Sequence, residues 1–452
     1  MKLFVGAPRS GKTTRALQLL CRLICRIIFA DPQFELAQYA ARQTTNHAAS
    51  YYERLSHPGV PFLGVFESPL DGMEKIAGDL WERRKIWEIL LGRRNIDALE
   101  NPLLAFNADL FLRGVQYQRD YFPLHWLPYV FNTNCTLFDQ FCDGITHEPT
   151  RVEIERLRYL PAREQRFELG PMERLMGPPL RDPTIMYRCG THDIADFIRR
   201  HNRIYVEGQS ALPEGVYGGT QAWFYGAVDF VRTYREPLVF CVGEAANIGG
   251  HGRGIFTEDF LRAAATMEKL GLELVVIVQS IHQLDEDIRT ELLDLCNSIT
   301  CFRIASPATA DILAEVMATP RLDPDEISHS TWNTRQFHDG YEDIDEKIVS
   351  KYRLEYDLQD HYRPLSDQVK LMKKTLMTLR VGECVVNERG RVWKEQTPPL
   401  RDPYPWGLSD RYLDELRTRN QWSTNIEFPE IVPRAKEDSK RSSSRSKGKG
   451  TK

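Results

Sequence analysis

The first twenty residues restrict the fold more than any other part of the sequence. Residues 1–5 (MKLFV) are a short apolar run, which predicts a β-strand. Residues 6–13 (GAPRSGKT) have the spacing of a phosphate-binding glycine loop, and residues 14–20 (TRALQLL) have apolar side chains at helical spacing. A strand, this glycine loop and a helix in that order are the setting in which the motif binds phosphate. The sequence therefore predicts a site for a nucleoside triphosphate.

Each part of the glycine loop has a predicted contact with the nucleotide. The main-chain N–H groups of the loop and of the helix N-terminus would surround the phosphates, and Lys12 would reach the outer ones. Thr13 would be a ligand of the Mg²⁺ ion that bridges these phosphates. The residues predicted to hold ATP are Gly6, Pro8, Arg9, Ser10, Gly11, Lys12, Thr13 and Thr14. The alternative is a chance match in a glycine-rich turn, and the flanking strand and helix argue against it.

Composition limits the other classes of function. The chain has 452 residues, a net charge of −4 and a pI near 6.3, so it has material for more than one domain and is not uniformly basic. Its nine cysteines are spread singly, which predicts free thiols in a reducing compartment rather than a disulfide framework or a zinc site. No run is apolar enough for a membrane-spanning helix, and no signal peptide precedes the first strand. A cytoplasmic protein is expected.

Strands alternate with helices in two separate parts of the chain. Strands are predicted at residues 1–5, 26–31, 203–207, 237–242, 272–278 and 298–304. Their near-continuous apolar runs indicate an α/β fold with a parallel sheet that helices cover on both faces. Between the second and third strands, helical patterns dominate and β-branched runs are few, which predicts an all-helical insertion.

The predicted division of the chain follows from these patterns. It assigns residues 1–32 to the start of the core, 33–190 to the insertion, 191–320 to the rest of the core, 321–432 to a C-terminal extension and 433–452 to a disordered basic tail. In the extension, a charged and mostly irregular stretch is expected before a helix at residues 365–379. A hairpin should follow, with residues 387–390 as its turn. The tail could hold nucleic acid, hold a partner or keep the chain end solvated.

Two polar residues at strand ends are candidates for the chemistry of hydrolysis. Hydrolysis needs a group that orients the attacking water at the carboxyl end of a strand near the glycine loop. Glu244 fits because it follows an apolar strand and precedes a glycine-rich loop. Gln279, at the end of strand 272–278, is the candidate sensor of the γ-phosphate. An ordinary strand-end carboxylate is the alternative for Glu244.

The order of these landmarks resembles that of the HerA/FtsK superfamily of ring-forming, DNA-pumping ATPases. The glycine loop is followed by Asp31-Pro32, Glu244, Gln279 and the segment 297–303, as in the branch of HerA, conjugative coupling proteins and type IV secretion ATPases. Members of that branch also carry a helical insertion after the second strand. The resemblance implies a P-loop NTPase fold of the RecA-like, additional-strand type, with ATP and Mg²⁺ as cofactors. It is weaker in the C-terminal segment, at residues 382–386 and 398–399.

The resemblance also implies roles for individual residues. It assigns phosphate and Mg²⁺ binding to Lys12 and Thr13, polarisation of the attacking water to Glu244 and sensing to Gln279. In these rings each nucleotide lies between two subunits, and the neighbour supplies an arginine. Arg303 is the first choice for this arginine finger and Arg289 the second. A surface arginine at a strand end is the alternative for Arg303.

One position departs from the pattern of the family. The usual acidic pair at this strand end is Asp-Glu, and here the first position is Gly243. The missing aspartate normally helps to hold Mg²⁺ through the water shell of the ion. The metal would therefore be bound more weakly, or by another carboxylate such as Asp31.

Two classes of function are consistent with these residues. The first is an ATP-driven motor, a homo-hexamer that threads double-stranded DNA through its pore and relies on a membrane, capsid or nuclease partner protein. The second is a nucleotide-gated assembly module with weak hydrolysis that recruits a partner protein. A kinase of small substrates is a third possibility, and the lack of a recognisable lid or acceptor site argues against it.

Two further segments have a DNA-binding interpretation and a plain one. The glycine-rich loop 248–254, with His251 and Arg253, is a candidate pore loop or a plain connector. A basic cluster beside Trp81 and Trp87 is either a DNA-facing patch or a solvated helix face. The members of this cluster are Arg83, Arg84, Lys85, Arg93 and Arg94.

Overall fold

A nine-stranded sheet forms the centre of the molecule. The computed structural model describes residues 1–32, 35–43, 49–55, 59–67, 72–96, 101–208, 213–247, 255–344, 347–400, 408–419 and 429. The strand order is β11-β10-β7-β1-β6-β5-β2-β4-β3. The seven strands from β7 to β3 pair in parallel, and β10 and β11 run antiparallel at one edge. The predicted α/β fold with a mostly parallel sheet is confirmed.

The parallel strands lie close to their predicted positions. In chain order they are β1 (Lys2–Val5), β2 (Arg26–Asp31), β3 (Ser50–Arg54), β4 (Arg203–Glu207), β5 (Leu238–Val242), β6 (Leu272–Val278) and β7 (Ser298–Cys301). β6 lies between β1 and β5, which is the strand order of the additional-strand type. All five residues of β5 are buried, as expected for a central strand covered on both faces.

The segment predicted as an all-helical insertion contains one strand of the sheet, β3. Its five residues are too few to show a periodic pattern. Its tyrosines pack on opposite faces of the sheet, and this packing stabilises the strand. Tyr51 lies in the core on one face of the sheet and Tyr52 in the core on the other. The other long elements described in this segment are helices, joined by loops such as residues 59–67. Its helices are α2 (Glu35–Arg42), α3 (Gly72–Ile96), α4 (Pro102–Gln116), α5 (Leu127–Val130), α6 (Thr136–Gly144), α7 (Glu148–Tyr159), α8 (Ala162–Arg181) and α9 (Pro183–Met186).

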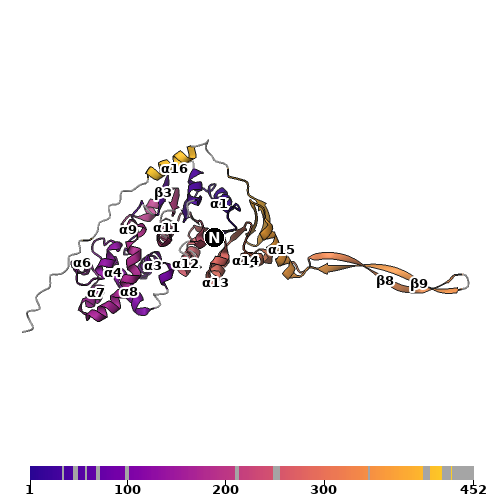
Figure 1. Cartoon of the computed structure of the whole chain (residues 1–452), viewed down its shortest axis with the longest axis horizontal. Coiled ribbons are helices and arrows are strands. Elements are labelled where there is room, and N and C mark those ends of the chain that lie inside the picture. Colours follow the sequence, from indigo (N-terminus) through magenta and orange to yellow (C-terminus); the bar gives the residue numbers. More distant parts are fainter. Residues whose placement is uncertain are drawn as a thin grey trace, which may run out of the picture.

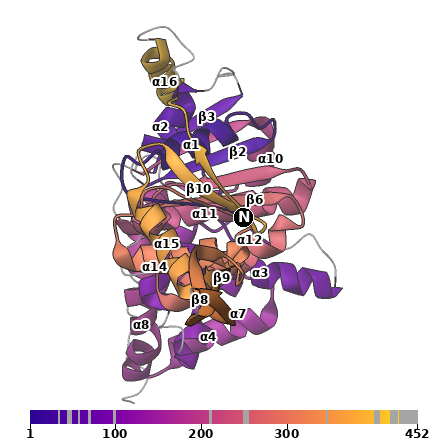
Figure 2. The ribbon, with the colours of Figure 1, turned by 90° about the vertical axis from the view of Figure 1, so that its right-hand side faces the viewer.

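Helices cover both faces of the sheet (Figures 1 and 2). Along β2, Ile28 and Ala30 belong to one core, and Ile27 and Phe29 to the other, as the two-residue period of a strand requires. The first core includes side chains of the insertion and of α10 (Ile194–Arg200), α11 (Pro213–Tyr234), α12 (Glu258–Glu268) and α13 (Glu286–Asp294). The second includes side chains of α1 (Lys12–Leu20), α2 and α16 (Leu408–Arg419).

A long β-hairpin, which we call the arm, extends away from the body (Figure 1). Its strands, β8 (Ile327–Ile344) and β9 (Lys347–Tyr362), form a separate two-stranded antiparallel sheet. The arm leaves the body between α14 (Pro307–Ala318) and α15 (Leu365–Thr378), and Figure 2 looks along it. The prediction of an irregular stretch here was wrong. The arm side chains that are described are exposed or half-buried, so its sequence lacks the alternation of a strand with one buried face.

The insertion is joined to the core by a buried carboxyl group. Glu88 of α3 is buried, and its Oε2 accepts a hydrogen bond of 2.6 Å from Thr257 Oγ1. Thr257 is also the N-cap of α12, where its Oγ1 accepts a bond of 3.0 Å from Phe260 N. Burial raises the pKa of Glu88 from 4.5 to about 7. The protonated acid is therefore favoured in the folded state.

Stability should depend on the protonation of Glu88. A folded-state pKa above the unfolded value means that the contribution of Glu88 is full below about pH 4.5 and is lost as the pH rises to about 7. The loss should be roughly 3 kcal/mol. Urea unfolding of the wild type and of Glu88→Gln from pH 4.5 to 8 isolates this change, because glutamine does not titrate. A constant difference between the two proteins would contradict the prediction.

Candidate nucleotide-binding site

The candidate site lies at the carboxyl edge of the parallel strands. β1 pairs with β6, β6 with β5 and β5 with β2, so the residues that follow these strands share one edge. With strands about 4.8 Å apart, the ends of β1 and β5 are about 10 Å apart. The topology thus brings the glycine loop, Gln279 and Glu244 to one edge of the sheet.

The two fixed glycines of the glycine loop stand where the backbone allows no side chain. A Cβ atom on Gly6 would lie 2.7 Å from Phe302 Cβ and 2.9 Å from Ser10 Oγ. Gly11 has a φ of 110°, and a Cβ atom there would lie 3.3 Å from Gly382 Cα. Glycine is therefore needed at position 6 because neighbouring atoms leave no room for a side chain. It is needed at position 11 because the φ angle there disfavours other residues.

Groups that attract phosphate converge at the start of α1. Gly11 is the N-cap and supplies no side-chain cap, and the N–H groups of a first helical turn have no partner within the helix. Lys12 is 6% exposed, and its Nζ donates a bond of 3.1 Å to the Ala7 carbonyl, which holds the ammonium group over the loop. Ser10 Oγ is a buried oxygen without a hydrogen-bond partner among the described residues. These groups fit a nucleotide phosphate.

The remaining loop residues are at the surface of this site. Pro8 and Arg9 are exposed, and Arg9 has a φ of 59°, in the left-handed region. Thr13 and Thr14 are half-buried in the first turn of α1. The role of Thr13 as a ligand of Mg²⁺ stays a prediction.

Glu244 has a strained main chain. It follows β5 with Gly243 between, and its φ of 47° lies in the left-handed region, where a residue other than glycine costs about 1–3 kcal/mol. Its side chain is half-buried. Such strain is often found at functional sites. The role of Glu244 in orienting water stays a prediction.

Gln279 and Arg303 lie on either side of the glycine loop. Val278 O accepts a bond of 3.3 Å from Gly6 N, which places the half-buried Gln279 next to the start of the loop. The Arg303 carbonyl accepts a bond of 2.8 Å from Ala7 N, and its side chain is exposed. Arg303 thus lies beside the loop of its own chain, and its action on a neighbouring subunit stays a prediction. The alternative finger, Arg289, is half-buried on α13.

The C-terminal hairpin forms part of the wall of the site, a contact that the sequence did not predict. The hairpin itself is confirmed, with strands β10 (Glu383–Glu388) and β11 (Arg391–Gln396). Gly382 N donates a bond of 2.9 Å to Ser10 O. Two contacts join α1 to this segment, Arg15 to Glu395 at 2.7 Å and Gln18 Nε2 to the Pro398 carbonyl at 2.6 Å. The weak family resemblance of residues 382–386 was the available signal for it.

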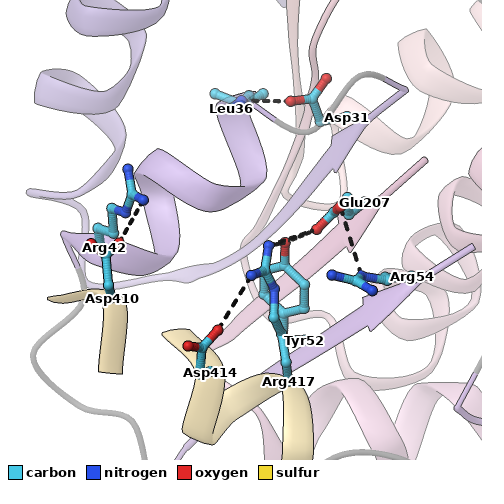
Figure 3. Close-up of polar contacts among 9 residues, drawn as sticks. All are labelled: Asp31, Leu36, Arg42, Tyr52, Arg54, Glu207, Asp410, Asp414 and Arg417. Atoms are coloured by element: carbon cyan, nitrogen blue, oxygen red, sulfur yellow. Dashed lines mark hydrogen bonds and ion pairs between the residues drawn. The ribbon is translucent and has the colours of Figure 1, made fainter. Parts of the chain in front are cut away.

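A second group that the sequence did not predict lies at the end of β4 (Figure 3). The Glu207 side chain is fully buried, accepts a hydrogen bond from the Tyr52 hydroxyl and lies 3.3 Å from Arg417 of α16. Burial, followed by the bond to Glu207, raises the pKa of Tyr52, so this hydroxyl remains a donor. The group fixes the C-terminal helix onto the sheet across 210 residues of sequence.

In the basic cluster of α3, each of the three residues whose side chains are described forms an ion pair with an aspartate of this chain. The pairs are Arg83–Asp109 at 2.7 Å, Arg84–Asp259 at 2.5 Å and Lys85–Asp229 at 2.7 Å. Neighbouring Asp229 and Glu82 raise the pKa of Lys85 against the effect of burial. Arg83 and Lys85 are therefore neutralised by carboxylates away from the surface, whereas the Arg84 side chain is 53% exposed beside Asp259.

Several predictions concern parts of the chain outside the described residues. They are the side chains of Arg93 and Arg94, the candidate pore loop 248–254 and the basic tail 433–452. Within the described part, all nine cysteines are free thiols, and no three His, Cys, Asp or Glu side chains are grouped so as to hold a metal ion. Among the described helices, none combines the length and the apolar composition needed to cross a membrane.

Comparison with known proteins gives structural relatives only. No protein-family model matches the chain, and no curated protein matches its sequence. The bacterial conjugative coupling protein TrwBdeltaN70, in an unbound form, has a TM-score of 0.55 at 12% identity, over 89% of this chain and 86% of its own. The plasmid coupling protein TrwB in complex with ADP and Mg²⁺ has a TM-score of 0.59 at 12% identity, over 89% and 87%. VirB4 of Thermoanaerobacter pseudethanolicus has a TM-score of 0.48 at 14% identity, over 88% and 89%.

The two coupling-protein structures establish the fold. The chain shares the fold of these two structures, so the predicted P-loop NTPase fold with a mostly parallel sheet is confirmed. At 12% sequence identity, these two matches show a shared fold and do not show a shared function.

Proposed function

We propose that the chain is an ATP-driven motor that moves double-stranded DNA, acting as a ring of identical subunits with six as the expected number. The proposal rests on the residues that lie together at one edge of the sheet. A glycine loop with a buried Lys12 and a strained Glu244 two strands away share this edge, in a fold also found in a plasmid coupling protein. TrwB has been solved with ADP and Mg²⁺, and the loop here has the donors for the same ligands.

The proposed mechanism assigns each step to residues of the chain. The loop N–H groups and Lys12 hold the phosphates, and Thr13 would be a ligand of Mg²⁺, which neutralises charge on the phosphates when it is bound. Glu244 accepts a hydrogen bond from the attacking water and orients it toward the γ-phosphate. Gln279 contacts the γ-phosphate, and Arg303, or else Arg289, acts on the site of the neighbouring subunit. Motion would come from the change in contacts once the γ-phosphate leaves.

The second candidate is a nucleotide-gated assembly module with slow hydrolysis. Gly243 favours it, because no carboxylate stands at the usual metal-supporting position. Phosphate release with and without duplex DNA separates the two candidates. A motor should release phosphate faster when DNA is present, whereas an assembly module should turn over slowly in both conditions.

Particle images with an ATP analogue and duplex DNA test the architecture. The expected image is a six-membered ring with density through its pore. A monomer under these conditions would contradict the motor. If the protein binds no nucleotide at all, both candidates fail.

The arm should not be the part of the motor that holds DNA. Residues 327–362 contain eight Asp and Glu against four Lys and Arg, a net charge of −4, which repels a phosphate backbone. At the base of the arm, Arg363 N donates a hydrogen bond of 2.8 Å to Glu326 O. The two strands are therefore close enough at this point for a short turn to connect them. Replacing residues 328–361 by an Asn-Gly turn should leave the slope of DNA affinity against salt concentration unchanged. A shallower slope, measured by fluorescence anisotropy, would show that the arm contacts phosphates.

A further inference from the structure

We infer that Asp31 supplies the carboxylate that is missing at Gly243 and helps to hold Mg²⁺ through its water shell. This inference rests on the proposed nucleotide site and concerns which residue of this chain supports the metal there. Asp31 would be a positioning residue, because its carboxylate would orient the water molecules bound to the ion and would not touch the reacting atoms.

Strand pairing brings the two positions together. Asp31 is the last residue of β2, and β2 pairs with β5 in parallel, with Ala30 opposite Val242. Gly243 N donates a bond of 2.9 Å to Ala30 O, so the ladder continues past the end of β5. Residues 31 and 243 therefore stand next to each other on the face of the sheet that α1 covers.

The carboxylate of Asp31 reaches the space beside Gly243. A Cβ atom built on Gly243 would lie 3.3 Å from Asp31 Oδ1. An aspartate side chain at position 243 would begin at this Cβ atom, so Asp31 Oδ1 already lies within the volume that such a side chain would use. The carboxylate that the family places on β5 is thus replaced by one that comes from the neighbouring strand.

The position of Asp31 is fixed. Its side chain is 3% exposed, and Oδ2 accepts a bond of 2.5 Å from Leu36 N in the first turn of α2 (Figure 3). This bond orients the other oxygen toward Gly243. A buried carboxylate held by a main-chain donor is the kind of group that orients the outer shell of a metal site.

Only one of the two positions has room for a carboxylate. A Cβ atom on Gly243 would also lie 3.1 Å from Leu36 Cδ2, so an aspartate there would press on α2 and stand against the like charge of Asp31. Glu207 is the next carboxyl group along this edge, opposite Asp31 on β4. It is engaged by Tyr52 and Arg417 (Figure 3), which leaves Asp31 as the carboxyl group beside Gly243.

A variant that keeps the helix contact but removes the charge distinguishes metal support from a capping role. Asp31→Asn retains an oxygen that can accept from Leu36 N and loses the negative charge. Binding of a fluorescent ADP is measured against Mg²⁺ concentration and again in EDTA, and Mn²⁺ replaces Mg²⁺ for paramagnetic resonance of the bound ion. We expect the half-saturating metal concentration to rise 10–100-fold and the affinity in EDTA to stay unchanged.

The second variant moves the carboxylate back to β5. Asp31→Ala combined with Gly243→Asp removes the like charge and the 3.3 Å contact with Asp31 Oδ1, and the remaining close atom, Leu36 Cδ2, is the end of a flexible side chain that can shift. The double variant should therefore restore most of the metal affinity that Asp31→Asn loses. Asp410→Asn is the matched control, because Asp410 is an exposed aspartate on α16 that pairs with Arg42 and should leave the metal dependence unchanged.

Each outcome separates this inference from the proposed function. If the wild type binds ADP with a metal dependence that Asp31→Asn does not alter, Asp31 only caps α2 and the inference is wrong while the nucleotide site stands. If Asp31→Asn does not fold, Asp31→Ala takes its place, and a wild-type metal dependence in Asp31→Ala overturns the inference in the same way. A wild type without metal-dependent nucleotide binding would overturn both.

Discussion

Replacing Glu244 by glutamine is expected to lower ATP turnover about 10²–10⁴-fold and to leave nucleotide binding in place. The amide can still occupy the strained turn after β5, but it is too weak an acceptor to polarise the attacking water. Binding should persist because the phosphates are held by the glycine loop on β1, which is separated from β5 by β6. Single-turnover phosphate release measures the first effect, and titration of a fluorescent ATP analogue measures the second.

Two comparisons make this result specific to Glu244. Glu315→Gln changes an exposed carboxylate on α14 and should leave turnover unchanged. Lys12→Ala should instead abolish binding, because it removes the buried ammonium group beside the Ala7 carbonyl. If Glu244→Gln turned over ATP at the wild-type rate, the strain at this residue would need another explanation.

The sequence predicted the parts of the site that depend on local structure. The glycine loop, the strand before it and the helix after it are contiguous, so their chemistry is visible in one window of residues. Glu244 and Gln279 were predicted for a related reason, since each follows a continuous apolar run that is typical of a buried strand. That β6 lies beside β1, and β5 beside β6, could not be predicted from the residues alone, and the additional-strand type implied by the family resemblance was the indication of this order.

The contacts that could not be predicted join residues far apart in the sequence. Asp31 and Gly243 meet because β2 pairs with β5, and Arg417 meets Glu207 because α16 returns across the sheet. No local pattern marks either contact. The arm and β3 were missed for a different reason, because neither has the single buried face that gives a strand its alternation in sequence.

The other large effect is expected at a buried ion pair that joins β3 to the end of the insertion. Glu53 of β3 and Arg188, two residues after α9, are 2.7 Å apart, and both side chains have 0% exposure. The same carboxylate accepts bonds from Trp223 Nε1 at 2.5 Å and from the Tyr51 hydroxyl at 2.9 Å. Burial, and next the charge of Glu53, raises the pKa of Tyr51, so its hydroxyl stays a donor.

Arg188→Met should lower the free energy of unfolding by about 3–5 kcal/mol, because it leaves the Glu53 carboxylate buried without a cation. Methionine keeps most of the volume beside Phe62, whose ring lies 5.2 Å from the guanidinium carbon, so the effect should come from charge rather than from a cavity. Adding Glu53→Gln should recover part of the loss, since the neutral amide can still accept from Trp223 and Tyr51. Urea unfolding of the two single variants and the double variant measures this coupling.

Arg151→Met is the matched control, because Arg151 pairs with Glu148 at the surface of α7 and should change stability little. Equal losses in Arg188→Met and in the double variant would mean that packing, and not the buried charge, dominates at this position.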